Sequence, residues 1–437
     1  MEWWSVLLFF IGGLVFLFLL GFPIAFSFLL MDFVCIALFM GATGLELLNL
    51  HIFSSLSTFV IVPIPLFIFM GELMFHSNLA YETIDVLDRW LGRLPGRLSL
   101  LAAVSGTIFA ATSGSTMANT AMLGTALLPE MKKRGYSTYM SVGPIIGVGG
   151  LAMLIPPSAL AVVLASIAQI SVGGMLLAGV IPGIILGSIF FSYIVLHAWL
   201  RPASAPSFQI EQSSLITKVK LTIKYILPVS FIIFMVLGLI ILGIATPTES
   251  AAAGVAATML VSFIYGRFNW KMLKASLKGS LDVTVMVFMI IAASKTFSAV
   301  LSFSGASTGL VEMVEGMAVH PILILVAMQI IIAVMGCFME PISIMMIALP
   351  VFIPIAELLN FDLIWFGVLM LINLEMGQMS PPFGMLIFVM LGVTPAEVTY
   401  EKIALASVPY MLFDVIVMAM IIIWPQIALW LPKMIGQ

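Results

Sequence analysis

The sequence predicts an all-α polytopic membrane protein that is built as an inverted-topology repeat. Two re-entrant helical hairpins and two helices broken at Pro-Pro pairs are its expected elements. Three observations predict this fold class. The 437 residues are 62% apolar and only 8% charged, whereas a soluble domain carries about 25% charged residues. Many apolar stretches reach the ~20 residues that span a bilayer. The pairs Pro156–Pro157 and Pro381–Pro382 interrupt two of these stretches, and proline breaks a helix.

The first half of the chain is expected to contain spans, one interfacial helix, one hairpin and one broken helix. Glu2 is acidic and no basic residue precedes the first apolar run, so a retained span is expected rather than a cleaved signal peptide. The run from 81 to 97 mixes apolar residues with six charges, which is typical of a helix at the membrane interface. The segment 41–57 is expected to be a loop. Spans are predicted at 5–20, 23–40, 58–75 and 175–200, a hairpin at 98–129 that turns near Gly114, and a helix at 139–170 that breaks at Pro156.

The second half repeats this layout after two further spans. Spans are expected at 223–244, 250–265 and 283–303, followed by a mildly acidic stretch at 304–318. The run 321–354 is interrupted by "CFMEPIS" near Met339, which predicts the second hairpin, and the run 364–391 breaks at Pro381–Pro382. One last span at 402–430 closes the chain.

The distribution of basic residues supports two hairpins that return to the side they entered. With the N-terminus outside and two such hairpins, 15 of the 17 basic residues fall on the inner side, as the positive-inside rule requires. If either hairpin were a full crossing, every later basic loop would move outside. The inner residues are Arg89, Arg93, Arg97, Lys132, Lys133, Arg134, Arg201, Lys218, Lys220, Lys224, Arg267, Lys271, Lys274, Lys278 and Lys402.

A shift of 225 positions relates the two halves. It maps Ser115 onto Glu340, Pro129 onto Pro354 and Pro156–Pro157 onto Pro381–Pro382. The second half then enters the membrane from the opposite side, which is the signature of secondary transporters. Non-helical backbone at bilayer depth is tolerated where it lines a cavity. The two breaks and the two hairpin tips are therefore expected to form one site near the midplane.

The polar residues near the breaks suit a small hard cation and an anion. Hydroxyl, amide and carbonyl oxygens are ligands for a cation such as sodium rather than for zinc or copper, and free N–H groups at new helix starts favour an anion. Interhelical packing by small residues is the alternative explanation. The first set is Thr112, Ser113, Ser115, Thr116, Asn119 and Thr120, and the second is Glu340, Ser343, Asn373, Glu375, Gln378 and Ser380.

Lys295 is the one basic residue placed inside a span. A lone ammonium in hydrocarbon costs roughly 2.5–3.5 kcal/mol on insertion scales, so it needs a partner or a wet cavity. Three interpretations stay open: an ion pair with Glu340, Glu375 or Glu72, snorkelling toward the outer face, or contact with an anionic substrate.

Several motifs together resemble one known family. They are "PLFIFMGELM" at Pro65–Met74, "SGST" with "LPEMKKRGYS", "GLAMLIPPS", "ATPTESAAAG", "NLEMGQMSPPFG" and "LWLP". Over nearly its whole length the chain resembles the large membrane subunit of tripartite ATP-independent periplasmic (TRAP) transporters, within an ion-transporter superfamily of elevator folds. The resemblance implies sodium-driven uptake of a small organic anion, with no ATP and no prosthetic group. It also implies two partners, a periplasmic substrate-binding protein and a small four-helix membrane subunit, in the bacterial inner membrane with both termini periplasmic.

The resemblance also assigns roles to residues and segments. It places one sodium site at Ser113, Ser115, Asn119, Gly149 and Pro156, and another at Gly336, Gly377 and Ser380. With the analysis of the hairpin tips and of Lys295, it gives the substrate contacts Thr116, Pro157, Glu340, Pro382 and Lys295. The expected division is scaffold at 1–97 and 171–320, a transport domain at 98–170 and 321–391, and a last span at 392–437.

An intramembrane enzyme acting on lipids needs clustered Asp, Glu or His at one depth, and the sequence shows no such cluster. The charges lie in short loops, so no nucleic acid is expected as a partner. The remaining alternative is a stand-alone sodium- or proton-coupled anion transporter of the same superfamily, without a binding protein.

Overall fold

The computed structural model describes residues 2–77, 79–92, 94–206, 214–395 and 397–435. The side chains of Ala42, Thr43, Leu47, Ala80, Tyr81, Thr112 and Ser113 lie outside the described part. All regular elements within these ranges are helical, as the sequence predicts. Seven of the described helices are long and apolar enough to cross a membrane, which fits a multi-pass membrane protein.

The N-terminal helices contain the first departure from the sequence prediction. Residues 41–57 were expected to be a loop, but most of them form α3, which packs against α2 and α16. This segment mixes Glu46, Asn49 and His51 with apolar residues, so its composition does not indicate a membrane helix. The bounds are α1 Trp3–Leu19, α2 Ile24–Phe39, α3 Gly41–Leu56, η1 Phe59–Ile61 and α4 Pro63–His76.

The predicted interfacial helix, first hairpin and first broken helix follow in order. The interfacial helix is held to a later helix by the Trp90 indole, which donates to the Thr222 hydroxyl at 2.8 Å. The hairpin turns at Gly114–Ser115, where it was expected. The bounds are α5 Leu79–Leu91, α6 Arg97–Ser113, α7 Thr116–Lys133, α8 Thr138–Gly150, η2 Leu151–Met153 and α9 Ala159–Ala168.

In the middle of the chain, the described residues 172–206 and 214–264 are mostly helical. The run Leu215–Ile241 contains two π-helical turns, η4 and η5, within one continuous helix. The bounds are α10 Val172–Ala178, α11 Val180–Leu200, η3 Pro202–Ser204, α12 Leu215–Leu221, η4 Thr222–Ile226, α13 Leu227–Ile233, η5 Phe234–Gly238, α14 Leu239–Ile241 and α15 Pro247–Ile264.

The last part of the chain holds the second hairpin and the second broken helix. Helix α16 begins at Trp270, earlier than the span expected from residue 283, and the acidic stretch forms α17. The closing segment is two helices rather than one, because the chain turns at Trp424–Pro425. The bounds are α16 Trp270–Phe303, α17 Ala306–Glu315, α18 Pro321–Gly336, α19 Pro341–Leu358, α20 Leu363–Met379, α21 Met385–Val393, α22 Tyr400–Ile423 and α23 Gln426–Met434.

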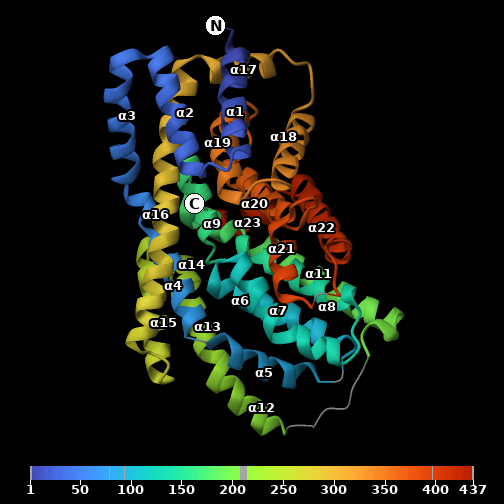
Figure 1. Cartoon of the computed structure of the whole chain (residues 1–437). Helices are drawn as coiled ribbons and strands as arrows, with labels where there is room; N and C mark the ends of the chain where they lie inside the picture. The colour runs from blue at the N-terminus through green and yellow to red at the C-terminus, as the bar shows by residue number, and fades with distance from the viewer. Residues whose placement is uncertain (1, 78, 93, 207–213, 396, 436–437) are drawn as a thin grey trace.

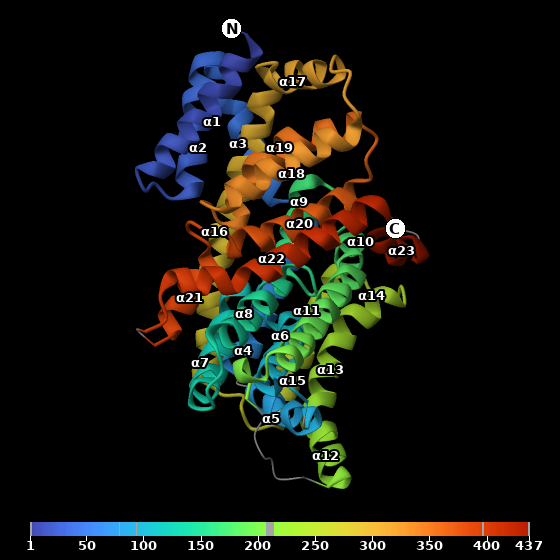
Figure 2. The same cartoon turned by 90° about the vertical axis from the view of Figure 1, so that its right-hand side faces the viewer.

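Helix α16 runs along one side of the molecule and contacts α2, α3 and α4 (Figure 1). On the other side α22 packs against α8 and α20, and α11 packs against α6, α8 and α22 (Figure 2). The two hairpins and the two broken helices thus lie between α16 and the α11–α22 pair. This arrangement positions the hairpin tips next to α4 and α16.

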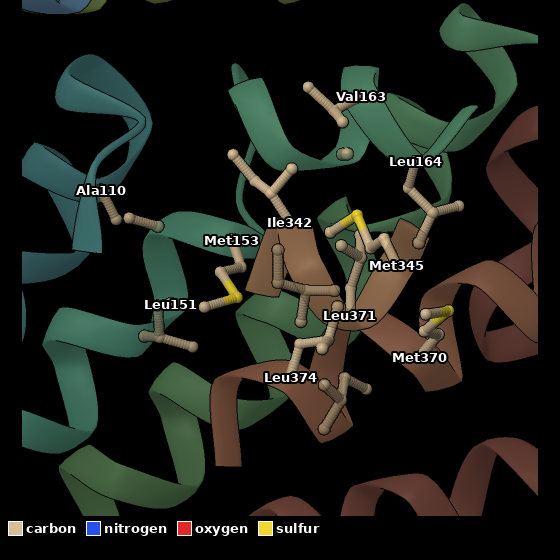
Figure 3. Packing of buried hydrophobic residues seen from close by; sticks show 14 of the residues in the cluster. Ala110, Leu151, Met153, Val163, Leu164, Ile342, Met345, Met370, Leu371 and Leu374 are labelled. Atoms are coloured by element: carbon tan, nitrogen blue, oxygen red, sulfur yellow. The ribbon is translucent and has the colours of Figure 1, made fainter. Parts of the chain in front are cut away.

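A core of apolar side chains joins the two halves behind the tips (Figure 3). Ile342 and Met345 from α19 meet Val163 and Leu164 from α9, and all four are buried. Residues that are 178 or more positions apart in the chain therefore share one packed core. The other labelled members are Ala110, Leu151, Met153, Met370, Leu371 and Leu374.

The helix bounds of the two halves correspond. Thr116 and Pro341, the first residues of α7 and α19, are 225 positions apart, and both helices have 18 residues. Thr138 and Leu363, which begin α8 and α20, are also 225 apart. The shift read from the prolines therefore also relates the starts of α8 and α20, which contain no proline.

Candidate functional site

A cavity of about 340 Å³ lies where both hairpin tips face α4 and α16. Its first wall is the tip Gly114–Ala118 with the start of α9, and its second wall is Glu340, Pro341 and Ile342 with Gln378. Helices α4 and α16 close the remaining side with Ile68, Gly71, Glu72, Phe75, Val283, Met286 and Val287. Both hairpin tips therefore line one cavity, whereas Pro156–Pro157 and Pro381–Pro382 are not among its lining residues.

The first tip is shaped by a left-handed glycine and a serine cap. Gly114 has a φ of +59°, and a Cβ there would lie 3.2 Å from the Pro157 carbonyl oxygen, so this position favours glycine. The Ser115 hydroxyl accepts a hydrogen bond from the Ala118 N–H at 3.3 Å and begins α7. The tip therefore lies directly against the Pro156–Pro157 break.

Asn119 connects the first hairpin to the first broken helix. Its side chain is fully buried, and its amide nitrogen donates to the carbonyls of Gly106 at 3.1 Å and Val148 at 3.4 Å. Its Oδ1 atom accepts no hydrogen bond from the described residues. Thr120 packs directly on Gly149. The structure thus brings Asn119 and Gly149 together and leaves one buried oxygen available for a cation; the Ser113 side chain lies outside the described residues.

The second tip begins α19 with a carboxylate in place of the serine. Glu340 Oε1 accepts from the Ser343 N–H at 3.1 Å and from the Ser343 hydroxyl at 3.0 Å. A carboxylate is favourable at a helix N-terminus because it faces the positive end of the dipole. Glu340 is therefore both the helix cap and a wall of the cavity.

The residues assigned to the second sodium site are also close together. Gly336 of α18 and Gly377 of α20 cross so closely that a Cβ on either would lie 2.7 Å from the other's Cα. Ser380 follows one turn later, is buried, and donates its hydroxyl to the Met376 carbonyl at 2.9 Å. The backbone of α18 and α20 and the Ser380 hydroxyl thus meet at the second break.

Glu72 faces the two tips from α4. Its Oε2 atom lies 3.3 Å from Nε2 of His76, one helical turn later, and its carboxylate lies against Gly279 of α16. The α4 backbone is also held to α16, because the Ser276 hydroxyl donates to the Glu72 carbonyl at 3.2 Å. Glu72 is therefore fixed on the wall opposite the tips.

Three predicted substrate contacts do not line this cavity. Pro157 is buried next to Gly114, while Pro382 is exposed and its carbonyl accepts from the Tyr400 hydroxyl at 2.7 Å. Lys295 is half-buried on α16. Among the described residues no carboxylate lies within 4.0 Å of its ammonium, so the expected ion pair with Glu340, Glu375 or Glu72 does not form in this structure.

The pairing of Glu375 with Asp414 was not predicted from the sequence. Glu375 of α20 and Asp414 of α22 are fully buried and close enough to interact electrostatically, and none of their four carboxyl oxygens accepts a hydrogen bond from the described residues. Glu375 packs on Gly150, which the 225-residue shift maps onto Glu375 itself. The available signal was Asp414, an isolated acid in an apolar helix.

The fold is that of a membrane transporter. The structure resembles the crystal structure of the Alcanivorax borkumensis YdaH transporter with a TM-score of 0.63 at 13% sequence identity, and the match covers 91% of this chain and 90% of that one. The chain also matches the family described as "Tripartite ATP-independent periplasmic transporter, DctM component" over residues 11–427, and it belongs to this family.

Curated relatives agree with this assignment. The chain is 30% identical to the C4-dicarboxylate TRAP transporter large permease protein DctM of Pseudomonas aeruginosa, over 89% of this chain and 90% of the relative. It is 29% identical to the ectoine TRAP transporter large permease protein TeaC of Halomonas elongata, over 96% and 97%. Such large permeases work with a smaller subunit and a periplasmic binding protein, and they are transporters rather than enzymes.

Proposed function

We propose that this protein is the large permease of a sodium-coupled TRAP transporter that imports a small organic anion. A periplasmic binding protein delivers the substrate, and a small four-helix membrane subunit completes the transporter. The observation that carries the proposal is the cavity that both hairpin tips line together with α4 and α16. The buried Oδ1 atom of Asn119, which has no hydrogen-bond donor among the described residues, adds support for a cation in the first hairpin. We place the protein in the bacterial inner membrane with both termini periplasmic.

Sodium binding at the two breaks is the first part of the proposal. Oxygen ligands suit this ion, and the structure supports two groups of them: Ser115, Asn119 and Gly149 with Pro156 in one, and Gly336, Gly377 and Ser380 in the other. On the same tip, we assign Ser113 to the first sodium group and Thr116 to contact with the substrate.

Uptake by reconstituted vesicles that contain the partner subunits tests the sodium sites. Asn119→Ala and Ser380→Ala each remove a contact to a charged group, which is worth about 1.5–3 kcal/mol, and should weaken the apparent sodium affinity by roughly tenfold or more. Thr125→Ala, on the exposed face of α7, is the matched control and should transport like wild type. Unchanged sodium dependence in both site variants would refute the assignment.

An elevator movement is the second part of the proposal. In inverted repeats, alternating access is largely a rigid-body movement of one unit around a fixed site. We propose that 98–170 and 321–391 move as one unit, and that α1–α5 and the elements from α12 to α16, η4 and η5 included, stay fixed. The packing of α11 and α22 against α8 favours adding these two helices to the moving unit.

Paired cysteines in a background without Cys35 and Cys337 test the movement. A cross-link between positions 90 and 222, whose side chains are hydrogen bonded, should leave uptake intact because both lie in the fixed unit. A cross-link between positions 117 and 283, which line the same cavity from the first tip and from α16, should stop uptake until it is reduced. The opposite pattern would exclude this division.

Omitting the binding protein separates the proposal from the stand-alone alternative. A TRAP permease should take up substrate only when the loaded binding protein is present. Uptake of free substrate at the same rate without it would favour a stand-alone sodium- or proton-coupled anion transporter.

A further inference from the structure

A second cavity, of about 610 Å³, opens at the end of α11. Its walls come from the start of α8, the end of α11 with η3, and α22, which pack against one another (Figure 2). The Ser137 N–H at the start of α8 donates to the Ser204 carbonyl of η3 at 2.9 Å, which ties two of these walls together. This cavity is separate from the one at the hairpin tips, because the two share no described lining residue.

The charged side chains that line this second cavity are basic. Arg201 follows the last residue of α11, and its guanidinium has no carboxylate within 4.0 Å among the described residues. His197 lies one turn earlier and interacts electrostatically with Arg201. No Asp or Glu is present among the described lining residues. The cavity therefore offers a guanidinium without a counter-ion, which is a favourable place for an anion.

Two tyrosine side chains lie beside this guanidinium. Tyr193 interacts electrostatically with both Arg201 and Tyr139, so the three groups are close together. The Tyr193 ring is held by edge contacts, with ring centroids 5.6 Å from His197 and 5.8 Å from Tyr410. A guanidinium can bind two oxygens of one anion, and a phenol donates one further hydrogen bond. The set therefore suits an oxyanion such as a phosphate group.

Exposed apolar side chains flank the cavity on both of its long helices. Helices α11 and α22 lie in runs that are long and apolar enough to cross a membrane. Trp199 and Leu200 on α11, and Leu405 one turn before Pro409 on α22, are more than half exposed. The lining residues of α11 run from Tyr193 to Leu200, which is about 10 Å along the helix. The cavity thus joins a basic end to apolar surface, as the headgroup and the first carbons of a phospholipid require.

We propose that this cavity binds the headgroup of an anionic phospholipid. The phosphate lies at Arg201 and Tyr139, and the glycerol backbone extends past His197 toward Tyr193. Under the proposed orientation the end of α11 faces the cytoplasm, so the lipid comes from the inner leaflet, where basic pockets between membrane helices suit such headgroups. A soluble phosphate has the same charge but lacks the acyl chains that fit the apolar flanks. This inference goes beyond the proposed transport function and does not depend on the substrate.

The test measures lipid binding to the full chain, purified with its small subunit in a neutral detergent. Dioctanoyl phosphatidylglycerol is compared with dioctanoyl phosphatidylcholine and with glycerol 3-phosphate by native mass spectrometry and by the shift in melting temperature. Because the bound lipid contacts three helices, phosphatidylglycerol should raise the melting temperature, and it should bind about fivefold or more tightly than phosphatidylcholine. Equal binding of phosphatidylcholine, or equal affinity for glycerol 3-phosphate, overturns the proposal.

Variants of the arginine locate the binding site. Arg201→Gln should reduce the affinity for phosphatidylglycerol by about tenfold, because contacts to a charged group are lost. Arg201→Lys keeps the charge without the planar fork, so it should recover only part of that affinity. Arg201 is exposed, so both variants should fold normally. Lys220→Gln, on the exposed face of α12, removes the same charge outside the cavity and should bind like wild type.

A variant without a charge change separates the cavity from a general attraction between basic residues and anionic lipid. Tyr193→Phe removes one hydroxyl and should weaken phosphatidylglycerol binding by about threefold, with a melting temperature close to that of the wild type in the absence of lipid. If Tyr193→Phe leaves the affinity unchanged, or if Lys220→Gln lowers it as much as Arg201→Gln does, the overall charge holds the lipid and the proposed site is wrong.

Discussion

The two hairpin tips share one backbone plan and differ in charge. Ser115 begins α7 by accepting from the Ala118 N–H, and Glu340 begins α19 by accepting from the Ser343 N–H. Both the caps and their donors are 225 positions apart. Because a helix N-terminus accepts either a hydroxyl or a carboxylate as its cap, the repeated fold places a neutral wall and an anionic wall on the same cavity.

The two Pro-Pro breaks differ in burial. Pro156 and Pro157 are buried beneath the first tip, whereas Pro381 and Pro382 are exposed. The first break packs against the tip at Gly114, and the second reaches the surface, where the Tyr400 hydroxyl donates to the Pro382 carbonyl. The two breaks therefore have different surroundings, although the bounds of the helices around them correspond.

Buried amides join hairpin and broken helix in both halves, from opposite partners. In the first half Asn119 on the hairpin reaches Val148 on α8. In the second half Asn373, which corresponds to Val148 under the shift, donates to the Gln329 carbonyl and side chain on α18 at 2.6 and 2.8 Å. The two contacts are not equivalent, because α18 corresponds to α6 rather than to α7, so the second half uses the other helix of its hairpin.

A methyl group added where α18 and α20 cross should give the largest difference in stability between the two halves. Gly336→Ala places a methyl group 2.7 Å from the Gly377 backbone, which cannot move aside as a side chain does. We expect a loss of about 1–3 kcal/mol from overpacking and a lower melting temperature of the purified protein.

The first half supplies the matched control for this change. Ala111 and Ala152 correspond to Gly336 and Gly377, so this crossing already accommodates a methyl group on each helix. Ala111→Gly should cost only about 0.5–1 kcal/mol through glycine's backbone entropy. A Gly336→Ala protein that melts like wild type would show that the two crossings are equally spaced.

Local rules explain which of these features the sequence predicted. Proline and glycine act on their own backbone, so the tip at Gly114 and the breaks at Pro156 and Pro381 were found at the right positions. Contacts across the fold leave no such local signal. Helix α3 was predicted as a loop because its contact with α16 is set by tertiary packing, and Glu375 and Asp414 meet only because α20 and α22 pack together.

The two buried amides should differ in their response to sodium. Asn119→Ala and Asn373→Ala each remove two buried hydrogen bonds to neighbouring helices, each of which contributes about 0.5–1.5 kcal/mol. If Asn119 is a sodium ligand, its variant should also lose much of the stabilisation that sodium gives to the melting temperature, while the Asn373 variant keeps it. Equal loss of sodium stabilisation in both variants would place the ion at neither residue specifically.

The serine cap of the first tip should have a smaller effect. Ser115→Ala removes the acceptor for the Ala118 N–H and should cost about 0.5–2 kcal/mol, measured by denaturant or thermal unfolding. Ser115→Asp restores the cap and gives the first tip the charge of the second. It should recover stability but weaken anion binding, so recovery of both would contradict the assigned difference between the tips.

Replacement of Lys295 should have the smallest effect on stability and uptake. Its side chain is half-buried on α16, lies outside the cavity, and has no carboxylate within 4.0 Å among the described residues. A long lysine stem covers apolar surface while its ammonium reaches toward water, and methionine preserves most of that packing. Lys295→Met should therefore change stability by no more than about 0.5 kcal/mol and leave the Michaelis constant for uptake unchanged.

A raised Michaelis constant in a protein with wild-type melting temperature would restore Lys295 as a substrate contact. A lowered melting temperature that a Glu72→Gln or Glu340→Gln change rescues would instead show that it neutralises one of those carboxylates in another conformation of the transport cycle.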